Sequence, residues 1–203
     1  SDIVAFDGTS WRVLGSMNGV VNAMTVFNGS LVLGGPFSQI SGVVASGVVQ
    51  WNGSTWSALG VNAGGVGGTV RALAVFSGAL YVGGDITHAS GIPVGNLAIW
   101  NGTAWSAGAS FNSTVRALAA RITTTGPGSA LFVGGTFTTV GVIPASGVAR
   151  FDTVNSWAAM GAGLPGGCTA LFVRGVGMTG FELTAGVQSG AASTYRWSSG
   201  VWN

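Results

Sequence analysis

The sequence is short of charge. Charged residues make up 6% of its 203 residues, against about 25% in a typical soluble domain. It has no lysine, its seven arginines are spread along the chain, and its formal net charge is +2. A nucleic-acid-binding surface needs clustered Lys and Arg to displace counterions from phosphates. Nucleic acid is therefore not an expected partner, and so weakly charged a surface does little to oppose association between chains.

Several other features are missing. A single cysteine, Cys168, excludes an internal disulfide framework. No run of 18 uninterrupted apolar residues occurs, so we expect no membrane-spanning helix. The chain opens at Ser1 without an initiator methionine or a signal peptide, which predicts a processed chain or one excised from something longer.

Glycine and aromatic residues are abundant. The chain has 37 Gly, eight Trp and ten Phe, and 47% of its residues are hydrophobic. Disordered chains are poor in aromatics, so this composition predicts a folded core. The length suits one large all-β domain.

Two markers recur with one period, which indicates an internal repeat. Phrases such as FDGTSW, WNGSTW and WNGTAW end in tryptophans spaced by 45, 49, 52 and 45 residues. These structural repeat aromatics are Trp11, Trp56, Trp105, Trp157 and Trp202. Glycine pairs follow SLVL, ALYV and ALFV, and a degenerate fourth copy is expected at Ala185 and Gly186.

Each repeat divides into four strand-like runs. In the second repeat these are residues 70–76, 79–82, 96–100 and a run that starts near Trp105. Asn-Gly and Ser-Gly pairs separate runs rich in β-formers, which is typical of antiparallel hairpins. The repeat units are residues 1–15 (a half unit), 16–60, 61–109, 110–161 and 162–203, all within one domain. No sustained helical period occurs, so we expect almost no helix.

Four strands in a repeat of this length predict a β-propeller blade. The LYVGG and W-N-G-x-x-W phrases resemble those of kelch-like and galactose-oxidase-like propellers, and are most similar to the repeats of fungal cortical polarity-marker proteins. The resemblance covers nearly the whole chain. It implies an all-β, kelch-like propeller of four complete four-stranded blades with an N-terminal half-blade hairpin. It does not indicate one function, because propellers carry many.

The residues do not predict catalysis. The copper oxidases that the chain resembles use two Tyr and two His, whereas this chain has Tyr81, Tyr195 and one histidine, His88. We expect His88 to lie in a solvated loop, with Asp85 as a candidate partner. A sialidase-like hydrolase would need a converging Arg cluster with a Glu and a Tyr, whereas Glu182 is the only Glu and lies in the most degenerate repeat. We therefore predict no enzyme activity, no metal and no cofactor.

Other candidate residues have a structural and a functional interpretation. Cys168 aligns with Val21, Val70 and Val115, which predicts a buried strand position rather than a reactive thiol. Repeat-related arginines would bind anions along one rim or, in the interpretation we favour, pair locally. These aligned pairs are Arg71 with Arg116 and Arg150 with Arg196. Asp7, Asn52, Asn101 and Asp152 are expected to shape hairpin turns.

Four N-x-S/T sequons are candidate glycosylation sites: Asn28, Asn52, Asn101 and Asn112. Three of them are Asn-Gly pairs that also suit hairpin turns. In a chain with so little charge they favour an extracellular or cell-surface glycoprotein.

These observations predict a non-catalytic structural or adhesive module, whose partners are other copies of itself or neighbouring surface proteins. A glycan-binding, lectin-like propeller is the alternative, and a sialidase-like hydrolase a weaker one. The leading hairpin, residues 3–6 and 11–14, is surplus to four complete units. The chain is therefore a piece of a longer propeller, a ring that closes imperfectly, or a subunit that shares strands with a neighbour, and we favour the last.

Overall fold

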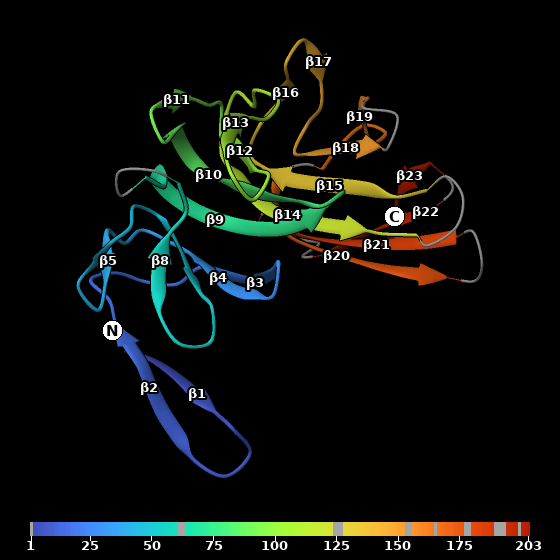
Figure 1. The fold of residues 1–203 in the computed structure, drawn as a ribbon. Coiled ribbons are helices and arrows are strands. Elements are labelled where there is room, and N and C mark those ends of the chain that lie inside the picture. Colours follow the sequence, from blue (N-terminus) through green and yellow to red (C-terminus); the bar gives the residue numbers. More distant parts are fainter. Residues whose placement is uncertain are drawn as a thin grey trace.

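The protein folds almost entirely into antiparallel β-structure (Figure 1). The structure is a computed structural model, and it describes residues 2–60, 64–123, 128–152, 156–164, 166–176, 180–188, 194–198 and 200–203. Over these ranges there is no helix, and every strand pair is antiparallel. The prediction of an all-β fold with almost no helix is confirmed.

Each of the larger sheets is built on four strands taken in chain order, and the second sheet has β11 as a fifth. The first sheet contains β3 (Ala23–Phe27), β4 (Ser30–Gly34), β7 (Val48–Trp51) and β8 (Trp56–Ala58). The second contains β9 (Val66–Phe76), β10 (Ala79–Ala89), β12 (Leu97–Trp100) and β13 (Trp105–Ala107). The third contains β14 (Val115–Arg121), β15 (Ala130–Gly135), β18 (Val148–Asp152) and β19 (Trp157–Ala159). The fourth contains β20 (Cys168–Val176), β21 (Gly180–Val187), β22 (Thr194–Ser198) and β23 (Val201–Trp202).

The segments between the second and third strands contain extra strands where the sequence predicted loops. β5 (Gln39–Ile40) pairs with β6 (Val43–Val44), β16 (Thr139–Val140) pairs with β17 (Ile143–Pro144), and β11 (Ile92–Pro93) pairs with the end of β10. Ser41 and Gly42 at the first of these turns have φ of 46° and 83°. Two successive positive φ angles make a tight hairpin turn, so a short Ser-Gly pair is enough to form one.

The four sheets stack through their first strands. β3 packs against β9, β9 against β14, and β14 against β20. Apolar side chains fill the space between neighbouring sheets: Leu73 and Val75 of β9, for example, pack in one cluster with Phe27 and Val32 of the first sheet. The hydrophobic core is thus a series of layers between sheets, and each inner sheet needs a neighbour on both sides.

The glycine pair at the end of the second strand has two separate spatial roles. A Cβ on Gly83 would lie 2.4 Å from Cγ1 of Val115 in the next sheet, so this glycine makes room for the neighbouring first strand. A Cβ on Gly84 would lie 2.0 Å from the main-chain oxygen of Thr69 in its own sheet. The first glycine therefore serves packing between sheets, and the second serves pairing within one sheet.

The strand register corrects the position of the fourth glycine pair. Ala185 pairs with Leu171, as Val82 pairs with Leu73 in the second sheet. The counterparts of Gly83 and Gly84 are therefore Gly186 and Val187, not Ala185 and Gly186. A Cβ on Gly186 would approach no atom closer than 3.5 Å, because no first strand of another sheet packs there.

The leading hairpin stands apart from the four sheets. β1 (Asp2–Phe6) and β2 (Trp11–Ser16) form a two-stranded sheet that projects away from the remainder of the molecule (Figure 1). Within it Phe6 pairs with Trp11, as Trp51 pairs with Trp56 in the first sheet. The hairpin therefore corresponds to the third and fourth strands of a sheet, as the sequence predicted.

Candidate functional site

The base of the leading hairpin is attached to the first sheet by specific hydrogen bonds. The indole Nε1 of Trp56 donates to the main-chain oxygen of Leu14 at 2.8 Å, and the main-chain nitrogen of Ser41 donates to the oxygen of Ser16 at 2.8 Å. Trp105 makes the same bond to Leu59 at 3.0 Å, one sheet further along. Leu14 of the hairpin thus accepts the indole hydrogen bond of Trp56, as Leu59 after the first sheet accepts that of Trp105.

The face of the hairpin beyond this base is apolar and exposed. Val4 and Val13 form one cross-strand pair, and Phe6 and Trp11 the next, with ring centroids 5.0 Å apart. Trp11 is 69% exposed, whereas Trp56 is 8% exposed. The same repeat position is therefore covered in one sheet and uncovered in the hairpin.

One edge of the hairpin is also unpaired. β1 pairs only with β2 among the described residues, whereas its counterparts β7, β12, β18 and β22 each pair with two strands. An unpaired strand edge presents main-chain N–H and C=O groups that can pair with another strand. A two-stranded hairpin is marginally stable alone, so an additional strand here would stabilise it.

The first strand of the first sheet is uncovered in the same way. Met24 and Val26 of β3 are exposed by 67% and 64%, and Val20 just before β3 is also exposed. Their counterparts in β9, Leu73 and Val75, pack against the preceding sheet. We call the exposed residues Val4, Phe6, Trp11, Val13, Val20, Met24 and Val26 the N-terminal apolar surface.

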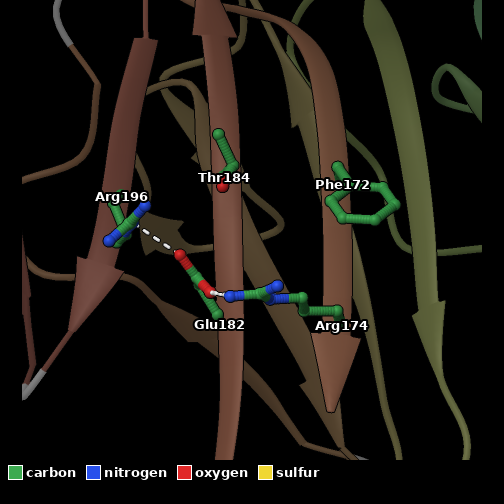
Figure 2. A pocket seen from close by; sticks show the side chains of 5 residues that line it. All are labelled: Phe172, Arg174, Glu182, Thr184 and Arg196. Atoms are coloured by element: carbon green, nitrogen blue, oxygen red, sulfur yellow. Dashed lines mark hydrogen bonds and ion pairs between the residues drawn. The ribbon is translucent and has the colours of Figure 1, made fainter. Parts of the chain in front are cut away.

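The last sheet ends instead in a charged face (Figure 2). Glu182 forms ion pairs with Arg174 at 2.7 Å and with Arg196 at 2.5 Å, using a different carboxylate oxygen for each. With Phe172 and Thr184 these side chains line a shallow cavity of about 200 Å³. Sequence reasoning missed this cluster, because the three charged residues become neighbours only through the pairing of β20, β21 and β22.

Both carboxylate oxygens of Glu182 are engaged within this cluster. A general acid or base needs a carboxyl oxygen directed at the reacting group. Both oxygens of Glu182 are occupied by arginines instead, and both arginine side chains are about two-thirds exposed.

Asp85 connects two sheets rather than pairing with His88. Its carboxylate accepts a hydrogen bond from Arg71 at 2.7 Å and another from the Thr114 hydroxyl, which precedes the third sheet. Partial burial raises the pKa of Asp85, but the Thr114 and Arg71 contacts outweigh it, so the pKa lies below its ordinary value. His88 is exposed, but it lies in β10, paired with Gly67 and Pro93, and not in the expected loop. Its Nδ1 lies 3.1 Å from the Thr87 hydroxyl.

Arg71, Arg150 and Arg196 pair within their own sheets, as the structural interpretation predicted, whereas Arg116 reaches a residue beside another sheet. Arg116 donates to Gln188 of the last sheet at 3.0 Å, and Arg150 lies 3.9 Å from Asp152. Arg71 is bound to Asp85, whose pKa the charge of Arg116 also lowers, and Arg196 is bound to Glu182.

Cys168 is fully buried and lies in register with Val70 and Val115. Burial raises the pKa of its thiol to about 12. Its Sγ lies where a Cβ on Gly134 would come within 2.5 Å, so the residue fills a packing position between sheets.

We predict that the native chain does not react with a maleimide at pH 8. The thiolate is the nucleophile, and a buried thiol with a raised pKa is neither ionised nor accessible. The measurement is intact mass after labelling, with a sample unfolded in urea as the positive control. Complete labelling of the folded chain within minutes would contradict the buried position.

The Asn and Asp residues of the hairpin turns act as expected. The Oδ1 of Asn101 accepts from the main-chain nitrogens of Thr103 at 2.9 Å and Ala104 at 2.8 Å. Asn52, Asp7 and Asp152 accept in the same way within their own turns. The hydrogen bonds around Asp7 hold its pKa well below the ordinary value.

The four candidate sequons differ in how their side-chain amides are used. Asn28, Asn52 and Asn101 lie at exposed turns. Asn112 instead accepts from the main-chain nitrogens of Thr138 and Thr139 and donates its Nδ2 to the Thr138 hydroxyl at 2.8 Å. Asn18 makes equivalent bonds to Ser38 and Gln39 in the first sheet. Asn112 is therefore part of a loop contact that modification of Nδ2 would disturb.

No metal site or membrane helix is found in the described part of the chain. No three His, Cys, Asp or Glu side chains come together there. It also contains no helix that is both long and apolar enough to cross a membrane.

The comparisons with known proteins give no further assignment. The chain matches no protein-family model and no curated protein. The N-terminal apolar surface, with the unpaired edge of β1, is thus the candidate functional site on structural grounds alone.

Proposed function

We propose that this chain is a non-catalytic structural or adhesive repeat protein that acts through contacts with other copies of itself or with neighbouring proteins. One observation carries the proposal: at the N-terminal apolar surface, residues whose repeat counterparts are buried or half-buried lie exposed beside a strand edge that is unpaired among the described residues. An exposed apolar patch of this kind marks an interaction site in soluble proteins.

We also propose that the four sheets are blades of a kelch-like β-propeller and that β1 and β2 form a half blade. The order of strands in each sheet and the packing of successive first strands support this arrangement. The glycine pair at the end of the second strand resembles that of kelch repeats. Its first glycine leaves room for the first strand of the next sheet at Gly34, Gly83 and Gly134.

A repeated lectin-like function is less well supported. In that case the repeat tryptophans would be presented to sugars at equivalent loops. Trp56 and Trp105 are instead buried, and each donates its indole N–H to the main chain of the preceding unit. The Arg174–Glu182–Arg196 cluster supports a hydrolase no better, since its charges pair with one another.

The test of the proposal is the assembly state of the intact chain. We expect sedimentation velocity to show an association that increases with protein concentration. A Val4→Lys/Trp11→Ser variant should remain monomeric, because a charge at the open edge and loss of the exposed indole both oppose contact. Val142→Lys is the matched control, since Val142 is 97% exposed in the β16–β17 turn, away from this surface. If the intact chain stays monomeric at high concentration and retains no protein partner, the proposal fails.

An extracellular or cell-surface location is part of the proposal, and glycosylation tests it. In a secreting eukaryotic host, we expect sugar at Asn52 and Asn101 and little at Asn112, whose Nδ2 is bound within the fold. Intact mass before and after glycosidase treatment, followed by peptide mapping, gives the occupancy of each sequon. An unchanged mass would contradict secretion through a glycosylating pathway.

A further inference from the structure

We infer that Arg116 and a cavity between the loops of the third sheet and the start of the fourth bind the carboxylate group of a small hydroxylated ligand. The site lies among the inner sheets and shares no residue with the N-terminal apolar surface, so the inference goes beyond the proposed function. Arg71 and Arg116 hold the same place in successive repeats, but only Arg71 has a carboxylate bonded to it.

Arg71 shows how this fold holds a carboxylate. It follows Val70, which pairs with Gly84, and the shift of register at this point makes Arg71 the extra residue of a β-bulge. A bulge redirects the side chain of its extra residue. The Nε of Arg71 lies 2.7 Å from Oδ2 of Asp85, the residue after the glycine pair, and the Thr114 hydroxyl donates to Oδ1. The bulge position can therefore form an ion pair with the residue that follows the glycine pair.

Arg116 stands in the same place without that carboxylate. Val115 pairs with Gly135, and Arg116 is again the extra residue of a bulge. The residue after this glycine pair is Thr136, which has no charge. The Nη1 of Arg116 donates instead to the amide oxygen of Gln188 at 3.0 Å, and its buried Nε has no hydrogen-bond partner among the described residues. One neutral oxygen thus takes a place where a carboxylate would offer two.

The charges around Arg116 favour a monoanion. Both carboxylate oxygens of Asp85 are already bonded, to Arg71 and to Thr114. Two arginines and one carboxylate leave one positive charge unbalanced in this group. A buried N–H without an acceptor costs free energy, and a planar carboxylate accepts from two guanidinium N–H groups at once. A monocarboxylate therefore matches both the charge and the donors, whereas a phosphate dianion would exceed the charge.

A cavity beside Thr136 has room for the rest of the ligand. Its volume is about 210 Å³. The residues that line it include Thr136, Phe137, Thr138, Ser146, Leu164 and Gly167. Three of these carry hydroxyl groups, and two are buried apolar side chains. A few polar groups next to apolar walls are typical of sites for small molecules, and hydroxyl groups here suit a ligand with hydroxyls of its own.

Gly167 leaves open the place that a threonine closes in the second sheet. It immediately precedes β20, as Thr114 immediately precedes β14. Thr114 uses its hydroxyl to bond Asp85 of the preceding sheet, whereas Gly167 has no side chain to do so. A ligand carboxylate in this open place would correspond to the carboxylate of Asp85, and Arg116 would reach it as Arg71 reaches Asp85.

We expect one such site in the described part of the chain. The first and fourth sheets carry Asn22 and Thr169 at the position of the arginine, and in the second sheet Asp85 already fills the place of the ligand. Only the third sheet combines an arginine with an uncharged residue after its glycine pair. Binding should therefore follow a one-to-one stoichiometry.

Glucuronate is the probe, and glucose is its neutral control. The two sugars share a hydroxylated ring and differ in the carboxylate. We expect isothermal titration calorimetry to show saturable one-to-one binding of glucuronate and none of glucose. In two-dimensional NMR spectra, glucuronate should shift the amide signals of Thr136, Gly147 and Gly167, which line the cavity.

Two variants with matched controls test the residues. Arg116→Gln should weaken glucuronate binding at least about tenfold, because it removes the charged donor. Arg150→Gln makes the same change of charge elsewhere in the third sheet and should bind normally. Thr136→Asp should abolish binding, because its own carboxylate would pair with Arg116 as Asp85 pairs with Arg71, whereas Thr136→Ser should retain it. Thr136 is exposed, so these changes should leave Tm unchanged or, for Thr136→Asp, slightly higher.

Glucuronate binding that is lost in Arg116→Gln and Thr136→Asp but kept in both controls supports the inference. Equal binding of glucose overturns it, as does an affinity that Arg116→Gln leaves unchanged or the lack of saturable binding at millimolar glucuronate. Amide shifts confined to β20, β21 and β22 would place the carboxylate at Arg174 and Arg196 and would also overturn it. Sedimentation tests the proposed function separately, so either proposal can fail while the other stands.

Discussion

Replacing Trp105 with alanine should destabilise the protein by about 3–5 kcal/mol, whereas the same change at Trp11 should cost about 0.5 kcal/mol or less. The two residues hold the same place in the repeat. Trp105 is 6% exposed, packs beside Trp100 at 5.3 Å and donates to the main-chain oxygen of Leu59. Its loss leaves a cavity and an unpaired carbonyl between two sheets.

The measurement is the Tm of the unmodified protein, Trp105→Ala and Trp11→Ala, determined under one set of conditions. For a chain of this size, 1 kcal/mol corresponds to a Tm shift of about 2–4 °C, so Trp105→Ala should unfold roughly 10 °C earlier. Trp105→Phe keeps an aromatic ring but loses the N–H donor, so its Tm should lie between those of Trp105→Ala and Trp11→Ala. Equal effects at Trp105 and Trp11 would mean that the hairpin is covered within the monomer.

The second large effect is expected at the glycine pair. Gly83→Val should destabilise the fold by about 1–3 kcal/mol or more, because its Cβ would lie 2.4 Å from Val115 across the interface between sheets. Gly186→Val is the matched control, since the nearest atom to its added Cβ is 3.5 Å away. Glycine is unfavourable within a strand, so the control should be neutral or slightly stabilising.

Chemical denaturation of both variants decides this point. The expected result is a lower midpoint for Gly83→Val and an unchanged or higher midpoint for Gly186→Val. A similar loss in both would show that glycine is needed for pairing within each sheet rather than for packing between sheets.

The turns and strands were accessible from the sequence because they depend on local chemistry. Asn101 and Gly102 form their turn with hydrogen bonds that span only three residues. The expected runs at residues 3–6 and 11–14 correspond to β1 and β2 within two residues. The burial of Cys168 was also correctly predicted, since alignment with valines at the same repeat position is a sufficient signal.

Features that depend on strand register could not be predicted from the sequence. The expected extent of the second strand in the second sheet was residues 79–82, whereas β10 continues to Ala89, because it pairs with the early part of β9 through two irregularities in register. The fourth glycine pair was placed one residue too early for the same reason. A shift of one residue moves a side chain to the opposite face of a sheet, and only the paired strands reveal it.

The repeat, the all-β class, the turns and the leading hairpin could be predicted from the sequence, because each follows from periodicity or from bonds between near neighbours. Which copies of the repeat are covered depends on how the sheets pack in three dimensions. Trp11 and Trp56 stand in closely similar sequence phrases, yet one is exposed and the other buried, because burial depends on whether a preceding sheet is present. The Arg174–Glu182–Arg196 cluster likewise exists only where three strands bring the charges together. The local sequence of each repeat specifies its own strands and turns, whereas the burial of a sheet's outer face depends on the sheet that packs against it.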